Sequence, residues 1–315
     1  MNLLVVGGAG YVGGAVTDLL SGSRHQVRVF DNLLFEESYR KRVDFAFGDV
    51  RNEAALRPHI EWADAVIWLA AIVGDGACSV DPEVSEHVNT ETVKWLAENF
   101  DGRIVFMSTC SVYGAQDGEL TEDSPLRPLS VYATTKCLAE TFLSGKNAIV
   151  FRLGTLFGIS DQFSRIRLDL VVNTMTVKAH TERHIKVFGG EQWRPLLHVR
   201  DAARAAILAV EAPESGVFNI HTTNMKMLTL ASAVKQHFPD LDVEVVDMKF
   251  EDSRNYKVSS AKAKQVLGFD PCFTVDDGIG ELKAILEQGR IKNVNNPIYT
   301  NHRYLDMFKA HLDFR

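Results

Sequence analysis

The stretch "GGAGYVGG", residues 7–14, decides how this chain is expected to fold. It follows the apolar run "LLVV" and precedes "AVTDLL", so it joins a predicted strand to a predicted helix. Gly7, Gly10 and Gly13 have the spacing GxxGxxG, which differs from the GxGxxG dinucleotide fingerprint. A tight strand-to-helix turn needs glycine where φ is positive, and the N-terminus of the helix attracts phosphate groups. The stretch therefore predicts a phosphate-binding turn, with a plain flexible turn as the alternative.

Short apolar runs alternate with helix-like stretches through the first half of the chain. The helix-like stretches include residues 11–23 and 83–100, and the apolar runs are "LLVVGG", "QVRVFD", "DFAFGD", "AVIWLAA", "RIVFMST" and "NAIVFRLG". Continuous apolar runs are typical of parallel strands that are buried on both faces. The alternation predicts an α/β fold with a Rossmann-type, doubly wound parallel sheet.

Acidic and small residues follow the predicted strands where a dinucleotide would lie. Asp31 ends the run "QVRVFD", and a carboxylate at this position accepts hydrogen bonds from both ribose hydroxyls of NAD. It would also repel the 2′-phosphate of NADP. The next strand leads to Asp49 and Val50, beside the adenine, and "LAA" at 69–71 places small residues near the pyrophosphate. The pattern indicates NAD as the cofactor, with Asp31 as an ordinary turn residue as the alternative.

A tyrosine and a lysine are spaced YxxxK in the segment "SVYATTK". Tyr132 and Lys136 are one helical turn apart and therefore share a face. A free tyrosine has a pKa near ~10, so it needs a nearby cation to act as a base at neutral pH. We expect the Lys136 ammonium to lower the pKa of Tyr132. Thr109, at the end of the run "RIVFMST", is placed to hydrogen-bond the same substrate hydroxyl.

With these motifs in place, the chain resembles the extended short-chain dehydrogenases/reductases, within the NAD-dependent epimerase/dehydratase family that acts on nucleotide sugars. The resemblance covers nearly the whole length and rests on "GGAGYVGG", "FDN", "GDV", "STCSVYG", "SVYATTK", "FRLGTLFG", "RPLLHVRDAARA" and "SRNYKVSSAKAKQVLGF". It implies that Tyr132 is the catalytic base, and that Lys136 is its partner and a ligand of the nicotinamide ribose. Thr109 would orient the reacting hydroxyl.

The resemblance also implies which residues bind NAD and the nucleotide-diphosphate sugar. Besides Tyr132 and Lys136, the cofactor positions are Gly7, Gly10, Tyr11, Val12, Gly13, Asp31, Asn32, Asp49, Val50, Leu69, Ala70, Ala71, Asn89, Ser108 and Leu153. The substrate positions are Thr109, Thr155, Arg194 and Arg254. The two arginines fall where the family grips the substrate diphosphate, which a guanidinium fork fits well. Salt bridging at the surface is their alternative role.

The residues after Thr109 bear on which reaction of the family is catalysed. The shared first step is oxidation of the sugar C4 hydroxyl. The 4,6-dehydratases carry Asp-Glu directly after the threonine, and the decarboxylases usually carry Glu at the second position, whereas this chain has Cys110 and Ser111. A C4 epimerase needs no further acid or base, because its ketone turns over and takes the hydride back on the other face. The resemblance therefore implies a nucleotide-sugar 4-epimerase.

Two segments favour a different reaction. Residues 70–83 and 158–173 resemble a subgroup that includes C4 dehydrogenases of nucleotide-linked sugars such as GDP-heptoses. In addition, Thr155 stands where galactose epimerases usually carry Asn. A C4 dehydrogenase/reductase without epimerisation is therefore the alternative. A non-catalytic NAD(H)-sensing protein is a third, but it would have no need of the threonine, tyrosine and lysine together.

Several histidines and one cysteine are candidates for further site residues. A Cys110 thiol that faces the sugar would shuttle a proton beside the C4 ketone, whereas a buried thiol would pack as a small apolar group. His198 is interpreted as a structural histidine on a strand. His180, His184 and His221 lack metal-ligand spacing, so no metal is expected.

The composition indicates a globular protein that binds neither nucleic acid nor membrane. The 315 residues are 46% hydrophobic and carry a formal net charge of −7, which repels a phosphate backbone. The longest apolar run is shorter than the roughly 20 residues of a membrane span. The four cysteines show no CxxC pairing, which is typical of a reducing compartment. We therefore expect a cytoplasmic protein.

The domain arrangement is predicted from where the alternating pattern loosens. Residues 1–158 are expected to form the NAD-binding domain, and 191–222 to return to it through the strand-like "PLLHVRD" and "VFNIHT". Residues 159–190 and 223–315 are expected to form mainly a smaller, C-terminal substrate-binding lobe. The resemblance further implies a homodimer, through the helices "EVSEHVNTETVKWLAENF" and "SVYATTKCLAETFLSG".

Overall fold

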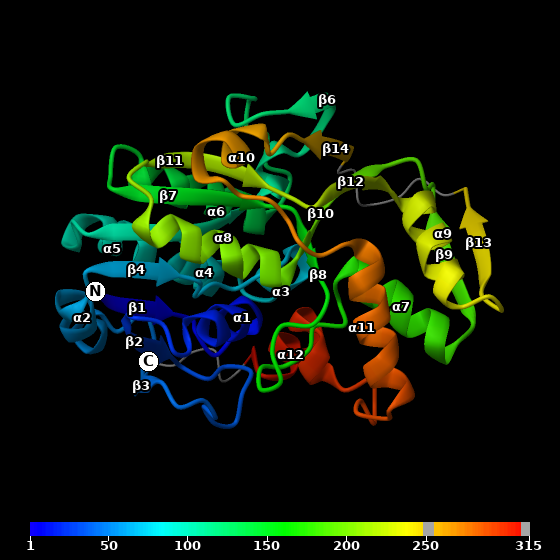
Figure 1. Cartoon of the computed structure of the whole chain (residues 1–315), viewed down its shortest axis with the longest axis horizontal. Coiled ribbons are helices and arrows are strands. Elements are labelled where there is room, and N and C mark those ends of the chain that lie inside the picture. The colour runs from blue at the N-terminus through cyan, green and yellow to red at the C-terminus, as the bar shows by residue number, and fades with distance from the viewer. Residues whose placement is uncertain (248–254, 310–315) are drawn as a thin grey trace.

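A seven-stranded parallel sheet forms the centre of the molecule, in the order β11-β7-β5-β4-β1-β2-β3. The computed structural model describes residues 1–247 and 255–309. The strands are β1 (Asn2–Val6), β2 (Gln26–Asp31), β3 (Asp44–Phe47), β4 (Ala65–Trp68), β5 (Arg103–Thr109), β7 (Ala148–Leu153) and β11 (Gly216–Ile220). All neighbours pair in parallel. The predicted doubly wound parallel sheet is confirmed, and Figure 1 shows its strands directed toward the smaller lobe.

Helices cover both faces of this sheet, because consecutive residues of the central strands are apolar and point to opposite faces. In β1, Leu3 and Val5 pack on one face, whereas Leu4 and Val6 pack on the other. The first face is covered by α1 (Tyr11–Leu20), α8 (Val199–Glu211) and α10 (Ala261–Leu267). The second is covered by α2 (Glu53–Trp62), α5 (Thr92–Asn99) and α6 (Val131–Leu143). Burial on both faces explains why the strands read as unbroken apolar runs.

The smaller lobe lies beyond the carboxyl ends of the large sheet (Figure 1). It contains the helices α7 (Val171–Thr181), α9 (Met227–His237) and α11 (Val275–Glu287), which share one apolar core. Two small sheets accompany them. One has the order β12-β10-β8 and the other the order β13-β9. Their strands are β8 (Thr155–Phe157), β9 (His184–Phe188), β10 (Trp193–His198), β12 (Thr223–Lys226) and β13 (Asp242–Val246).

One of the two strands expected to return to the large sheet does not do so. The segment "VFNIHT" supplies β11, which pairs with β7 as expected. The segment "PLLHVRD" instead supplies most of β10, which pairs with β8 and β12 in the three-stranded sheet. The reason is that β5 and β11 already occupy both edges of β7. The apolar run of β10 is buried between β8 and β12 instead. A buried run has the same apolar pattern in either sheet, so the sequence pattern alone cannot show which sheet it joins.

Two helices of the stretch expected mainly in the lobe pack on the large sheet instead. Ala263 of α10 belongs to the core beneath α1 and α8. Leu305 of α12 (Asn301–Met307) belongs to the core on the opposite face, where α12 lies against α3 (Asp75–Val80). A further pair, β6 (Ala115–Leu120) with β14 (Asn255–Val258), joins the two halves of the chain.

The surface helices predicted to mediate dimerisation lie side by side. The stretch 83–100 folds into α4 (Pro82–Glu86), a π-helical turn (His87–Glu91) and α5, which packs against α6. Leu138 of α6 is 41% exposed.

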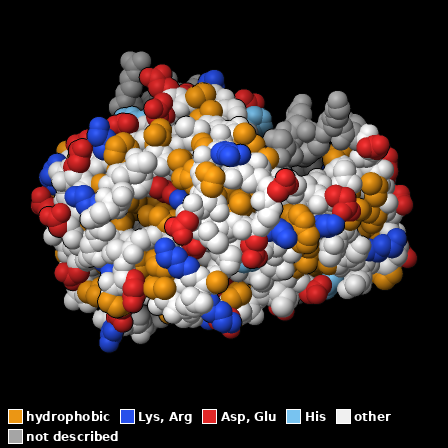
Figure 2. All heavy atoms as spheres, turned by 90° about the horizontal axis from the view of Figure 1, so that it is seen from above, with side chains coloured by type: hydrophobic (Ala, Val, Ile, Leu, Met, Phe, Trp, Pro, Cys, Tyr) orange, Lys and Arg blue, Asp and Glu red, His pale blue; other side chains and the backbone are white. Residues whose placement is uncertain are grey.

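On the face shown in Figure 2, acidic and basic side chains are interspersed rather than gathered by sign. Within residues 1–247 and 255–309, no helix combines the length and apolarity that crossing a membrane requires.

Candidate active site

A cleft of about 310 Å³ lies at the carboxyl ends of the strands, where the sheet order reverses between β1 and β4. Open parallel sheets bind ligands at this kind of switch point. The structure brings most residues predicted for the site together in its lining. They are Gly7, Gly10, Tyr11, Val12, Gly13, Asp31, Asn32, Asp49, Val50, Leu69, Ala70, Ala71, Ser108, Thr109, Tyr132, Lys136, Leu153 and Thr155.

The glycine turn has the shape that a dinucleotide pyrophosphate requires. Gly7 has a φ of +84°, and a Cβ there would lie 2.5 Å from the backbone nitrogen of Ala70. A Cβ on Gly13 would lie 2.5 Å from the carbonyl oxygen of Gly7. Gly10 precedes α1 and caps it without a side-chain hydrogen bond, and α1 has no acidic residue in its first turn. The N–H groups of this helix end are therefore available to a phosphate.

The acidic residues at the end of β2 and after β3 are held in place in the cleft by hydrogen bonds. The Asp31 carboxylate accepts hydrogen bonds from the backbone nitrogens of Ala9, at 3.0 Å, and Leu33, at 2.7 Å. Asp49 accepts hydrogen bonds from Arg51 Nε at 2.9 Å and from Asn32 Nδ2 at 3.0 Å. Since Asp31 lies in the lining with its orientation set by the backbone, it fits the ribose hydroxyls of NAD.

Thr109, Tyr132 and Lys136 meet at the end of β5 and the start of α6. Thr109 lies close enough to Tyr132 to lower the pKa of its phenol, and Thr109 Oγ1 accepts a hydrogen bond from Ser111 N at 3.1 Å. Lys136 is buried, with Nζ 4.6 Å from the centre of the Phe106 ring. The helix begins at Ser130, whose Oγ accepts the Ala133 N–H. This cap fixes where the YxxxK pair enters the cleft.

The protein groups around Tyr132 shift its pKa in the direction opposite to the one we expected. Burial is the largest influence and raises the pKa of Tyr132 above its ordinary value, and Cys78 raises it further. Arg167 and Thr109 act in the opposite direction without outweighing burial. Burial likewise lowers the pKa of Lys136 to about 8. The cleft thus removes water from both groups, and desolvation exceeds the attraction between neighbouring charges.

Two of the predicted site residues that the structure describes, Asn89 and Arg194, do not line the cleft. Asn89 is buried behind its wall, where Oδ1 accepts the Ile72 N–H at 2.8 Å and Nδ2 donates to Ile72 O at 2.9 Å. It therefore shapes the loop after β4 rather than facing the cleft. Arg194 is buried in β10 and donates to Trp193 O at 2.9 Å. Arg254 lies outside the described residues.

Cys110 and Ser111 take different positions after Thr109. The Cys110 thiol is buried in a small apolar cluster and donates to Arg152 O at 3.2 Å, and burial raises its pKa. This geometry supports the structural interpretation of Cys110, because the thiol is bonded inside the protein. Ser111 lines the cleft, with Oγ 3.5 Å from the Tyr256 hydroxyl. The position that carries a carboxylate in the decarboxylases thus presents a hydroxyl.

The lining also contains residues that the motifs did not indicate. Arg165 and Arg167 enter from the segment between β8 and α7, and Asn301 enters from the start of α12. The arginines lie in the stretch 158–173, for which the sequence predicts only side chains that face the sugar. Asn301 carried no signal, since its place in the cleft depends on the packing of α12 against α3.

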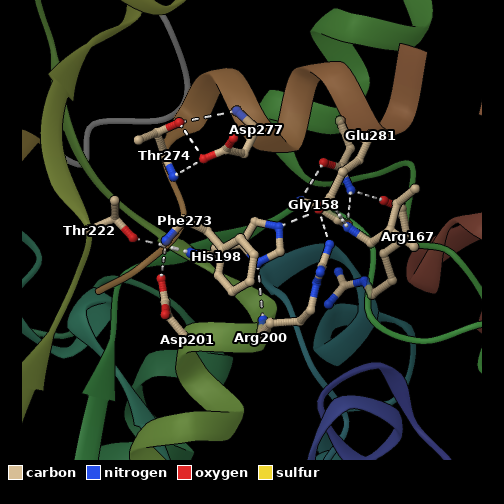
Figure 3. A network of polar contacts seen from close by, with 12 residues as sticks. Gly158, Arg167, His198, Arg200, Asp201, Thr222, Phe273, Thr274, Asp277 and Glu281 are labelled. Atoms are coloured by element: carbon tan, nitrogen blue, oxygen red, sulfur yellow. Dashed lines mark hydrogen bonds and ion pairs between the residues drawn. The ribbon is translucent and has the colours of Figure 1, made fainter. Parts of the chain in front are cut away.

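A buried polar network behind the cleft joins β10 to α8 and α11. Figure 3 shows His198 between Arg200 and Glu281, with the Phe273 ring stacked beside it. His198 Nδ1 accepts the Arg200 N–H at 3.2 Å, and Nε2 lies 3.2 Å from a Glu281 oxygen. Because Nδ1 is an acceptor, the ring is neutral and Nε2–H donates to Glu281. His198 therefore caps α8, a structural role.

The His198 ring is expected to make stability fall on mild acidification. Burial, assisted by Arg200, lowers its pKa to about 4, below the ordinary value near ~6.5. The unfolded chain then binds the extra proton first, so the free energy of unfolding decreases between pH 6.5 and pH 4. We expect this ring to account for about 2 kcal/mol between pH 6.5 and pH 5.

Urea unfolding of the wild type and of His198→Asn at several pH values measures this contribution. Asn is a strong N-cap and has no titrating group, so the variant should lose less stability over the same window. If Glu281 instead held the ring protonated, the native pKa would be raised. Acidification would then strengthen the wild type relative to the variant, which is the opposite sign.

The fold and the cleft define a class of protein before any comparison. A doubly wound parallel sheet, a glycine turn at β1, an acidic residue after β2 and a Thr-Tyr-Lys set at the cleft describe a dinucleotide-dependent enzyme. The sequence pattern of the NAD dependent epimerase/dehydratase family matches residues 3–221, and the chain belongs to this family. Its cofactor is NAD, and the glycine turn and Asp31 fit that cofactor.

Related proteins carry more than one activity. UDP-glucose 4-epimerase from Corynebacterium glutamicum is 28% identical to this chain, over 91% of this chain and 94% of that protein. dTDP-glucose 4,6-dehydratase from an Actinoplanes species is 30% identical, over 90% of this chain and 97% of that protein. The crystal structure of Thermotoga maritima UDP-glucose 4-epimerase with UDP-glucose superposes with a TM-score of 0.80, at 23% identity, over 92% of this chain and 100% of that one. The reaction must therefore be argued from the site.

Proposed function

We propose that the chain is an NAD-dependent nucleotide-sugar 4-epimerase. The observation that carries this proposal is that Thr109, Tyr132 and Lys136 line one cleft, and that Thr109 is followed by Cys110, which is buried, and by Ser111. Bound NAD accepts a hydride from a carbon that bears a hydroxyl and can return it. The similarity to UDP-glucose 4-epimerase supports a sugar nucleotide as the substrate. A 4,6-dehydratase is disfavoured, because it needs carboxyl groups where this chain has a thiol and a hydroxyl.

Each residue of the set has a distinct task in this proposal. Tyr132 takes the proton from the sugar C4 hydroxyl and later gives it back to the C4 oxygen. Thr109 donates a hydrogen bond that holds the same oxygen in position. Lys136 places a positive charge one helical turn below the phenol and favours its ionised form. Epimerisation requires only that the 4-keto sugar turn over between the two proton transfers.

The second candidate is a C4 dehydrogenase/reductase that releases the keto sugar. It is favoured by the segment 158–173, which places Arg165 and Arg167 in the cleft. A sugar held by additional charged contacts would be hindered from turning over. The two candidates share the oxidation step, so an experiment must follow the fate of the C4 hydrogen.

The decisive experiment uses UDP-, GDP-, CDP- and dTDP-hexoses labelled with deuterium at C4, followed by NMR. A 4-epimerase should interconvert the C4 epimers without an added acceptor and keep the deuterium at C4. A dehydrogenase should accumulate one equivalent of 4-keto sugar per chain, with absorbance at 340 nm, and turn over only when a keto acid is added. Loss of the label to solvent, or release of water from C6, would contradict the proposal.

A further inference from the structure

A segment of the smaller lobe crosses the cofactor cleft and is tied down along its length. We call residues 159–170 the strap. Its first N–H, from Ile159, donates to Glu281 at 3.3 Å. Asp161 forms an ion pair with Lys41 at 2.5 Å. The N–H of Arg165 donates to Glu36 at 2.6 Å, so the strap contacts the loop after β2 as well as α11.

The strap rests on the helix that follows the glycine turn, and Gly14 makes this possible. A Cβ on Gly14 would lie 2.5 Å from Ser164 Oγ and 2.7 Å from Asp161 Oδ1. Gly14 is the last glycine of "GGAGYVGG" and is not one of the three glycines that form the predicted phosphate-binding turn. Its missing side chain lets the strap lie directly against α1, close to the helix end that receives phosphate.

Two arginines of the strap line the cleft, and their charges are not equally balanced. Arg167 forms a fork with Asp169, with both nitrogen–oxygen distances at 2.9 Å. Arg165 donates to Ile298 O at 2.8 Å and to the Asn301 side-chain oxygen, which are neutral acceptors. Across residues 1–247 and 255–309, no carboxylate lies within ion-pair distance of Arg165. Among the described residues, Arg167 thus has an ion-pair partner, whereas the Arg165 guanidinium donates only to neutral acceptors.

The Arg165 guanidinium, which lies in no ion pair among the described residues, is suited to bind an anion. Burial and the neighbouring Arg167 lower the pKa of Arg165 to about 9. The Arg165 guanidinium is also pinned, because it stacks on the Phe35 ring with 3.7 Å to its centre. Arg165 is half-buried, and an anion that meets a partly desolvated cation in a fixed position offsets the cost of that desolvation. The arrangement thus indicates a preformed site for an anionic group that the cleft receives.

The position of the arginines indicates which anion this is. The Tyr11 hydroxyl, on the first residue of α1, donates to Gly158 O at 2.6 Å, directly before the strap begins. Arg167 also lies close enough to both Tyr11 and Tyr132 to lower their pKa values. Arg167 thus lies near the first residue of α1, and the Arg165 guanidinium lies beside Phe35 in the loop after β2. We propose that Arg165 and Arg167 clamp the pyrophosphate of NAD against the N-terminus of α1.

The clamp goes beyond the proposed reaction, because it rests on the cofactor and not on which sugar is converted. A diphosphate from the nucleotide sugar is the other possible source of the anion. Calorimetry with ADP-ribose, which carries the dinucleotide pyrophosphate, and with UDP and GDP separates the two sources. The full chain is used after any bound nucleotide has been removed, and no turnover is needed.

We expect Arg165→Gln to weaken ADP-ribose binding by about 10- to 100-fold, the effect of one lost hydrogen bond to a charged group. Binding of UDP and GDP should change less than about twofold. Arg57→Gln is the matched control, since it removes the same charge from an exposed site on α2. Gly14→Val should weaken ADP-ribose binding as well, because it displaces the strap without altering either arginine.

Arg165→Lys is a second variant that tests the proposal even if the Arg165→Gln protein does not fold. It keeps the charge but lacks the fork, so ADP-ribose binding should fall by an intermediate amount. The melting temperature of each variant shows whether it is folded. The proposal is overturned if both Arg165 variants bind ADP-ribose as the wild type does. It is equally overturned if the loss falls on UDP or GDP, which would assign the clamp to the sugar nucleotide.

Discussion

Replacing Tyr132 by Phe is expected to lower kcat by about two to four orders of magnitude, with whichever nucleotide sugar proves to be the substrate. Phe fills the same space beside Thr109 but cannot take a proton from the sugar hydroxyl. The other two groups of the set cannot take the proton in place of Tyr132. Thr109 is a poor base, and Lys136 is cationic over much of the pH range. The glycine turn and Asp31 are untouched, so NAD should still bind. Steady-state kinetics and the cofactor content per chain together measure this separation.

A matched control removes a tyrosine hydroxyl elsewhere. Tyr299, in the 3₁₀ turn Pro297–Tyr299, is partly exposed and lies outside the cleft lining. Tyr299→Phe should leave kcat within about twofold of the wild type. A Tyr132→Phe enzyme that retained more than a tenth of wild-type kcat would show that another group moves the proton. The proposed roles of Thr109 and Lys136 would then have to be reassigned as well.

Replacing Glu140 by Gln is expected to lower the free energy of unfolding by about 3–5 kcal/mol. Glu140 is one turn beyond Lys136 on α6 and binds Arg152 of β7 through Nε at 3.1 Å and Nη2 at 2.7 Å. It also accepts a hydrogen bond from the Ser108 hydroxyl. The side chains of Glu140 and Arg152 are 6% and 5% exposed. Removing the carboxylate charge leaves the guanidinium buried without compensation, which costs more than the lost hydrogen bonds.

Urea unfolding of matched variants distinguishes this cause from simple loss of contacts. The double variant Glu140→Gln with Arg152→Met removes both charges, so it should be less destabilised than the sum of the two single changes. Asp270→Asn breaks an ion pair with Lys264 that is 69–70% exposed, and should cost less than about 1 kcal/mol. Equal costs at the buried and exposed pairs would contradict the argument.

Much of the cofactor half of the cleft could be predicted because its constraints are local. The positive φ of Gly7 and the one-turn spacing of Tyr132 and Lys136 depend on a few neighbouring residues. Asp31 is similar, since it follows directly from the end of β2. Each of these features is encoded within one strand, turn or helix, so it can be recognised before the tertiary contacts are known. The doubly wound parallel class of the sheet follows from the alternation of strands and helices, whereas the order of its strands does not.

The rest of the cleft could not be predicted in the same way, because it depends on contacts between distant segments. The strap reaches α1 only because Gly14 leaves room for Ser164, although the two residues are far apart in the chain. Asn301 enters the cleft because α12 packs on α3, and β10 leaves the large sheet because both edges of β7 are occupied. The direction of the Cys110 thiol is decided by the same long-range packing. Local pattern thus specified the elements and the cofactor turn, whereas competition for strand edges and helix faces placed the arginines over the cleft.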